Sequence, residues 1–172
     1  MEHFKKYIQE IENFPKEGIV FKDINTIYKD PKIWNELMMP LEKLISTLRP
    51  DYIAGIESRG FISGSALALK LELGFIPIRK ANKLPGKVIG INYKLEYGDD
   101  RLEIQQDLVS KDSKIIVMDD LLATGGTACA AGRLIKKAGA NLIGYAFLVE
   151  LTGLNGRKEL DSNLIIESVI KY

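Results

Sequence analysis

The sequence predicts an α/β fold with a mostly parallel central sheet flanked by helices. Strand-like apolar runs alternate with helical stretches along the chain, which is typical of parallel strands joined by crossover helices. The clearest run, IIVM at residues 115–118, is short and rich in β-branched residues, as expected of a strand buried on both faces. A chain of 172 residues fits one domain with a sizeable core. We therefore expect a single domain over residues 1–172.

The first thirty residues predict a short helix followed by an extended segment. Phe4, Ile8 and Ile11 share one face at helical spacing, so residues 3–12 are expected to form an amphipathic helix. Residues 18–24 are expected to form an edge strand or loop.

A longer helix is expected next. Asp30 followed by Pro31 is a favoured helix start, because the aspartate caps free N–H groups and proline tolerates the first helical position. Pro40 is expected to kink or split this helix, and Pro50 to stop it.

The remaining elements follow from apolar runs and helix-ending glycines. We expect strands over residues 52–56, 75–78, 142–151 and 164–170, and helices over 61–73 and 128–138, ended by Gly74 and Gly139. Residues 81–107 are long, polar and interrupted by Pro and Gly, which is typical of a lid rather than of a compact connection. Alternation around 88–93 and 101–105 predicts a hairpin-like flap there, with a mobile tip.

The end of the strand at 115–118 carries the most informative motif. Ligands of open α/β sheets bind beyond the carboxyl ends of the strands, where this chain has Asp119 and Asp120. Carboxylates accept hydrogen bonds from paired ribose hydroxyls. The following turn offers free N–H groups, glycines and threonine hydroxyls, which suit a phosphate. Its residues are Ala123, Thr124, Gly125, Gly126 and Thr127. The sequence predicts a sugar phosphate site, the alternative being an ordinary strand–turn–helix joint.

Other nucleotide motifs are absent from the sequence. There is no GK[ST] and no G-x-G-x-x-G, so neither a P-loop nor a dinucleotide fingerprint is present. A second turn, Glu57-Ser58-Arg59-Gly60, follows the strand at 52–56 and is also suited to an anion. Taken alone, it would more simply be a solvated arginine in a connection.

Composition excludes several classes of function. Lys and Arg number 24 against 23 Asp and Glu, so no basic excess attracts nucleic acid or membrane. Charges interrupt every early apolar run, so no signal peptide is expected, and no stretch is long enough to span a membrane. The single cysteine, Cys129, excludes an internal disulfide and fits a reducing, cytoplasmic compartment.

Several blocks of the chain together resemble one family. They are FPKEGIVFKDI (14–24), ESRGF (57–61), RKANKLPG (79–86), YKLEYGDDRLEIQ (93–105), IVMDDLLATGGTA (116–128) and VELTGLNGR (149–157). These blocks resemble the adenine phosphoribosyltransferases of the type I phosphoribosyltransferase family. The resemblance implies that fold, with a small N-terminal hood (about residues 1–30) and a flexible flap (about residues 81–107).

The resemblance also implies a reaction and its partners. A phosphoribosyl group would pass from phosphoribosyl pyrophosphate (PRPP) to adenine, giving AMP and pyrophosphate. Mg²⁺ would enter with PRPP, because this ion keeps its waters and seeks substrate phosphates rather than a protein cage. A homodimer is the family expectation, and neither nucleic acid nor membrane is an expected partner.

Residue roles are carried over by the same resemblance. Glu96 is the expected acid or base, because a shielded lid carboxylate can have a raised pKa. Pyrophosphate is expected on Ser58, Arg59, Lys83 and Tyr97, with Arg79 reaching across from a second subunit. Adenine is expected on Val20, Phe21 and Lys22. Lys22 stands where many relatives carry arginine, so the backbone of this segment is the firmer part of the assignment.

Two other functions remain open at this stage. One is a phosphoribosyltransferase for another base, which would share the PRPP motif but not the KLPG and LEYG blocks. The other is a PRPP-sensing regulator without catalysis. Such regulators need a nucleic-acid module or a basic face, and this chain has no length for the first and no charge excess for the second.

Overall fold

The computed structural model describes residues 1–95 and 98–172. The helices are η1 (Glu2–Tyr7), α1 (Asn25–Lys29), α2 (Pro31–Leu48), α3 (Arg59–Lys70), η2 (Gln106–Leu108), α4 (Gly126–Lys137), η3 (Thr152–Leu154) and η4 (Gly156–Glu159), where η marks a 3-10 helix. The strands are β1 (Gln9–Glu12), β2 (Val20–Asp23), β3 (Tyr52–Ile56), β4 (Gly74–Lys80), β5 (Val88–Leu95), β6 (Gly98–Gln105), β7 (Lys114–Leu122), β8 (Asn141–Glu150) and β9 (Ile165–Lys171).

A mostly parallel sheet forms the centre of the molecule, as predicted. Within the described residues it has seven strands in the order β5-β6-β4-β3-β7-β8-β9. The strands from β4 to β9 in that order run parallel, and β6 pairs antiparallel with both β4 and β5. Because β3 and β7 are parallel neighbours, the turns that follow them lie at the same edge of the sheet.

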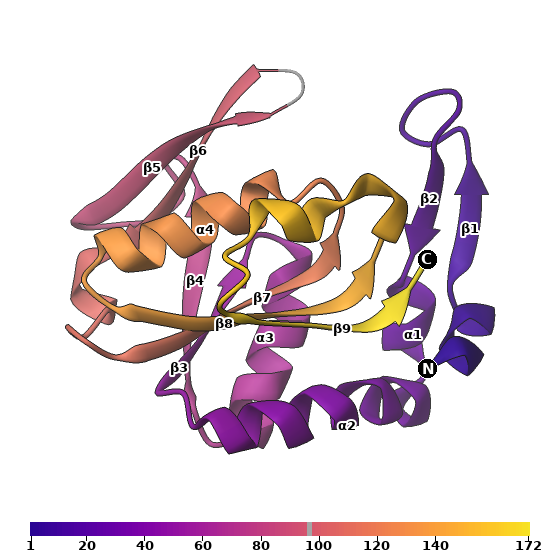
Figure 1. The fold of residues 1–172 in the computed structure, drawn as a ribbon, viewed down its shortest axis with the longest axis horizontal. Coiled ribbons are helices and arrows are strands. Elements are labelled where there is room, and N and C mark those ends of the chain that lie inside the picture. The colour runs from indigo at the N-terminus through magenta and orange to yellow at the C-terminus, as the bar shows by residue number, and fades with distance from the viewer. Residues whose placement is uncertain (96–97) are drawn as a thin grey trace.

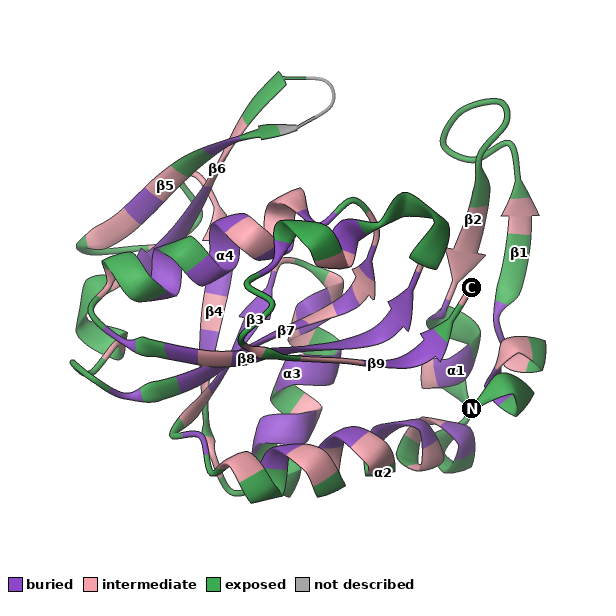
Figure 2. Ribbon diagram, viewed as in Figure 1, coloured by how far each residue is buried: buried purple, intermediate pink, exposed green. Residues whose placement is uncertain are grey.

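Strand β7 is buried on both faces, which confirms the prediction from its apolar run. Ile115 and Val117 belong to the core cluster that includes buried residues of α4, whereas Ile116 and Met118 belong to the cluster with residues of α2. Helices α2 and α3 cover one face of the sheet and α4 covers the other (Figure 1). The buried colouring of the central strands follows from this arrangement (Figure 2).

The N-terminal segment differs from the prediction. Only its first part is helical, as η1, and residues 9–12 form β1, which pairs antiparallel with β2. Phe4 and Ile8 are both buried in the core, although Ile8 follows η1 in an extended conformation. Beyond them, pairing with β2 satisfies the backbone of β1, so a tertiary contact overrides the local pattern.

Helix α2 begins as predicted and is not split. The Asp30 carboxylate accepts hydrogen bonds from the N–H groups of Lys32 (3.0 Å) and Ile33 (3.2 Å). The helix runs continuously through Pro40. Burial of its apolar face, which includes Leu37, compensates the backbone hydrogen bond that proline removes.

Helix α3 starts two residues earlier than predicted and ends earlier. Arg59 is its first residue and Lys70 its last, and Gly74 is the first residue of β4 rather than a helix end. The chain turns out of the helix at Glu72, which adopts a left-handed conformation with φ +56°. Local sequence favoured glycine for that role, but a non-glycine residue performs it here.

The flap contains the predicted hairpin. Strands β5 and β6 pair from Val88↔Gln105 to Leu95↔Gly98. Its base is fixed to the body, because Tyr93, Leu102 and Ile104 are buried in the core cluster with residues of α4. The β5–β6 and β1–β2 hairpins project from the same side of the molecule at its opposite ends (Figure 1).

The C-terminal elements also agree with the prediction. Strands β8 and β9 lie within one residue or so of the expected limits, and Gly139 follows α4 with φ +88°. The sequence did not predict η3 and η4, which lie between them. None of the helices among the described residues is long and apolar enough to cross a membrane.

Candidate functional site

A polar cavity of about 440 Å³ opens where β3 and β7 end. Its lining residues are Glu57, Ser58, Arg59, Lys80, Asp119, Asp120 and Thr127. The cavity therefore joins the two turns that the sequence singled out separately. The predicted ribose residues and part of the predicted pyrophosphate and phosphate residues share it, whereas Arg79 and Lys83 are not among its lining residues.

Asp119 and Asp120, the acid pair, lie inside β7 rather than beyond it, because the strand continues to Leu122. An Asp119 carboxylate oxygen accepts the Asp120 backbone N–H at 2.9 Å, and Oδ2 of Asp120 lies 2.7 Å from Nε of Arg59.

The environment of the acid pair makes it hold protons more tightly than free carboxylates do. Burial, together with the charge of Asp120, raises the pKa of Asp119 well above its usual range. Burial also raises the pKa of Asp120, although Arg59 opposes that shift. Both side chains thus offer acceptor oxygens on the cavity wall, to which hydroxyl groups of a ligand can donate.

Gly60 allows α3 to start directly against the acid pair. A Cβ at this position would lie 2.8 Å from the Met118 carbonyl oxygen and 2.9 Å from Oδ1 of Asp119. Any side chain would therefore push the first turn of α3 away from the floor of the cavity.

The phosphate turn (residues 123–127) packs against the C-terminal segment. Gly125 has φ +87°, and a Cβ there would lie 2.2 Å from the Gly156 carbonyl oxygen. A Cβ on Gly156 would lie 2.1 Å from the Ala123 carbonyl oxygen. The backbones of the two segments are therefore in direct contact. Helix α4 begins at Gly126, so the free N–H groups of its first turn face the end of this motif.

An ion pair between partly exposed Arg157 and buried Glu150 holds the C-terminal segment in place. Arg157 donates to both carboxylate oxygens of Glu150, with Nε and Nη2 at 3.1 and 2.6 Å, and its Nη1 donates to the Ile166 carbonyl at 2.7 Å. No functional role is predicted for this segment from the sequence. Its signal was the VELTGLNGR block, which includes Glu150, Gly156 and Arg157.

Glu57 was missed as an individual residue, although it stands in the ESRGF block. Its carboxylate binds Arg79 and Lys83, so these two predicted pyrophosphate residues contact a residue of the cavity wall rather than the cavity itself. Lys80 lines the cavity instead, and its Nζ contacts Asp100 and donates to the Tyr93 hydroxyl at 2.7 Å.

The hood places Phe21 near the acid pair. The Arg59 guanidinium lies 5.2 Å from the centre of the Phe21 ring, and Arg59 also contacts Asp120. Within the two-stranded sheet β2 pairs with β1 along one edge only. Among the described residues, no strand pairs with the other edge of β2.

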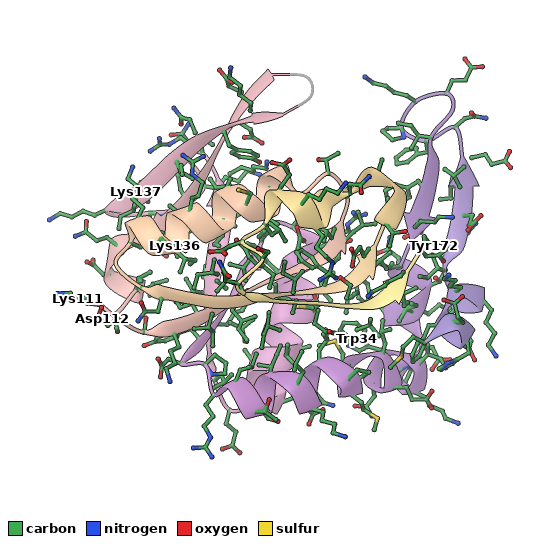
Figure 3. The ribbon with its side chains drawn as sticks, viewed as in Figure 1. Trp34, Lys111, Asp112, Lys136, Lys137 and Tyr172 are labelled. Carbon is green, nitrogen blue, oxygen red and sulfur yellow. The ribbon has the colours of Figure 1, made fainter. Side chains whose placement is uncertain are left out.

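The Lys22 side chain is engaged elsewhere. Its Nζ pairs with Glu10 and lies 4.3 Å from the centre of the Tyr172 ring, at the C-terminal end of the chain (Figure 3). The Lys22 side chain is therefore already paired, and the assignment of its backbone to a base stays a prediction.

Three residues remain to be placed, namely Tyr28, Glu96 and Tyr97. Tyr28, on α1, has a buried hydroxyl whose pKa is raised by burial and then by the charge of Asp120. Glu96 and Tyr97 lie outside the described residues, and their assigned roles stay predictions.

The fold and the cavity together define a phosphoribosyl transferase domain, and the model of that domain family matches residues 23–169. The chain is 74% identical over 172 residues, all of both chains, to an adenine phosphoribosyltransferase of Prochlorococcus marinus strain NATL1A. It therefore belongs to the adenine phosphoribosyltransferase family.

Solved structures agree with this assignment. The adenine phosphoribosyltransferase of Thermoanaerobacter pseudethanolicus is 45% identical, with a TM-score of 0.95 over 99% of both chains. The Saccharomyces cerevisiae enzyme, solved with an imino-altritol bisphosphate and adenine, is 41% identical, with a TM-score of 0.90 over 97% of this chain and 96% of that one.

Proposed function

We propose that this chain transfers the phosphoribosyl group of PRPP to adenine and releases AMP and pyrophosphate. One structural observation supports the proposal independently of family membership. The acid pair, the end of the phosphate turn and the cationic turn at Arg59 all face one cavity, and Phe21 lies beside Arg59. In the reaction N9 of adenine bonds to C1′ of the ribose, the C1′–O bond to pyrophosphate breaks, and the N9 proton leaves.

The ribose phosphate would be held by the elements that meet at β7. The two ribose hydroxyls donate to Asp119 and Asp120, which line the cavity. The 5′-phosphate accepts from backbone N–H groups of residues 123–127 and from the Thr127 hydroxyl. The same carboxylates stabilise the positive charge that develops on the ribose as the C1′–O bond breaks.

The leaving pyrophosphate would meet the turn that follows β3. Ser58, Arg59 and Lys80 line this side of the cavity and supply donors and positive charge. Mg²⁺ would enter as part of the PRPP complex. No cluster of three or more His, Cys, Asp or Glu positioned for a metal occurs among the described residues, and magnesium favours phosphate oxygens and water.

Adenine would bind at the free edge of β2. Its Watson–Crick edge can exchange hydrogen bonds with backbone groups of Val20 and Lys22, and Phe21 can stack on the ring. The yeast relative was solved with adenine, which supports this assignment of substrate. Glu96 would accept the N9 proton as the new bond forms.

We also propose that the protein is a cytoplasmic homodimer. Ile62 and Leu69 on α3 and Met39 on α2 are 44%, 81% and 55% exposed, which is costly for large apolar side chains in water. A second copy of this chain is the occupant that the family resemblance implies. Arg79 donates to Glu57 of its own subunit, so its reach into a second cavity stays a prediction of the resemblance.

The test is incubation of the purified protein with adenine, PRPP and Mg²⁺. We expect AMP and pyrophosphate to appear in equal amounts. Hypoxanthine and guanine serve as competing bases, and a preference for either would favour the other-base alternative. Absence of any pyrophosphate release would refute the proposed function and favour a PRPP-sensing role.

A further inference from the structure

Glu57 occupies an unusual position for a carboxylate. It follows β3 directly, its side chain is 10% exposed, and it lines the cavity in which an anionic substrate would bind. Its backbone N–H donates to the Ile78 carbonyl at 2.9 Å, so the residue is tied to the neighbouring strand β4. A negative charge here would repel pyrophosphate unless its cationic partners outweigh it.

Both oxygens of Glu57 are occupied by donors from β4 and the segment after it. Oε1 accepts from Lys83 Nζ at 2.8 Å and from Arg79 Nη2 at 3.2 Å. Oε2 accepts from Arg79 Nε at 3.3 Å and from the Lys80 N–H at 3.0 Å. Arg79 Nη1 also donates to the Lys83 carbonyl at 3.1 Å, which joins the two cations to each other. One carboxylate thus fixes two long side chains.

The cluster of Glu57, Arg79 and Lys83 keeps a net positive charge and unused hydrogen-bond donors. One carboxylate paired with two cations leaves a net positive charge beside the cavity. Hydrogen bonds to described residues occupy three of the five guanidinium N–H groups of Arg79 and one of the three ammonium N–H groups of Lys83. The remaining donors are available to a phosphate. Because Glu57 already restricts both side chains, less conformational freedom is lost when they bind a ligand.

We propose that Glu57 is a positioning residue for the leaving group: it holds Arg79 and Lys83 beside the cavity so that their remaining donors bind pyrophosphate. The inference rests on the proposed function, since it deepens the pyrophosphate part of that site. Burial opposes ionisation of Glu57, but the hydrogen bonds from Arg79, Lys83 and the Lys80 backbone outweigh it and lower the pKa to about 2. The carboxylate is therefore charged throughout the physiological pH range.

The proposal makes a prediction opposite to that of simple charge repulsion. Removing the Glu57 charge should tighten pyrophosphate binding if the carboxylate only repels the ligand. If it positions the cations, the same change should weaken binding, because Arg79 and Lys83 lose their common anchor. Glu57→Gln distinguishes the two, since the amide nearly preserves size but cannot accept from all four donors.

The experiment measures the affinity for Mg²⁺-pyrophosphate and for AMP by calorimetry. We expect Glu57→Gln to weaken pyrophosphate binding by at least about tenfold, the value of one charge-assisted hydrogen bond, and to leave AMP binding unchanged. In the reverse reaction the Michaelis constant for pyrophosphate should rise while that for AMP stays constant. A general folding defect would affect both ligands. Glu2→Gln, which removes the same charge from the Lys5 pair on η1, is the matched control.

Three outcomes would overturn the proposal. Unchanged or tighter pyrophosphate binding by Glu57→Gln refutes the positioning role alone, provided that the wild-type protein binds pyrophosphate. No pyrophosphate binding by the wild-type protein refutes the underlying site as well. If Glu57→Gln does not fold, Glu57→Asp carries the test, because its carboxylate is one methylene too short to reach both cations; wild-type affinity in that variant refutes the inference.

Discussion

The contact between Gly156 and the phosphate turn can be tested by adding one methyl group. In Gly156→Ala the new Cβ would lie 2.1 Å from the Ala123 carbonyl oxygen and 2.9 Å from both the Ala123 carbonyl carbon and the Gly125 nitrogen. All three are backbone atoms, so no side-chain rotation relieves the clash. Non-bonded contacts of a Cβ below 3.0 Å essentially never occur, so η4 and the turn must separate by about 1 Å.

The expected loss of stability and of AMP binding follows from the size of that displacement. Overpacking of this kind costs about 1–3 kcal/mol, and moving binding groups by about 1 Å costs roughly 10²-fold in function. We expect Gly156→Ala to weaken AMP binding by about 10–100-fold and to leave binding of Mg²⁺-pyrophosphate unchanged, because that ligand is proposed to bind at the turn after β3. The melting temperature should fall by roughly 2–4 °C for each kcal/mol lost in a domain of this size.

The same loop supplies the control. Gly153, in η3, has no atom within 4 Å of the position of an added Cβ, so Gly153→Ala should bind AMP normally. Calorimetry with AMP on both variants decides the matter. Equal AMP affinity in Gly156→Ala and Gly153→Ala, with both folded, would show that the C-terminal segment does not fix the geometry of the turn.

Three further predictions concern the acids of the site. Asp119→Asn combined with Asp120→Asn should weaken PRPP binding strongly, because amide groups replace buried carboxylate acceptors; unchanged binding by calorimetry would contradict the ribose assignment. Glu96→Gln should lower turnover far more than PRPP affinity, and equal steady-state activity would remove Glu96 from the mechanism. Glu57 has a pKa of about 2 when folded against 4.5 unfolded, so its stabilising effect is complete above about pH 4.5 and is lost as pH falls toward 2. In urea unfolding, the stability difference between the wild-type protein and Glu57→Gln should therefore shrink by at most about 3 kcal/mol between pH 5 and pH 2, and a constant difference would argue against the ion cluster.

Local signals predicted the parts of the site that local sequence determines. The acid pair and the phosphate turn follow one buried strand within a few residues, so apolar patterning and turn chemistry place them together. Gly156 and Glu57 depend on which segments meet in space, and no spacing within the chain reveals that. Residues 9–12 failed as a helix for the same reason, since their partner strand starts eight residues later.

The charges around the cavity explain how a site for an anionic substrate can contain several carboxylates. Asp120 pairs with Arg59, and Glu57 binds Arg79 and Lys83, so each acid restrains cations that would otherwise move freely in water. An unpaired cluster of cations would bind phosphates strongly but without defined geometry, and would hold the product as firmly as the substrate. In the proposed complex the ribose hydroxyls of PRPP supply new donors to Asp120 and free Arg59 for the pyrophosphate of the same molecule. The ribose and pyrophosphate parts of the cavity should therefore bind cooperatively.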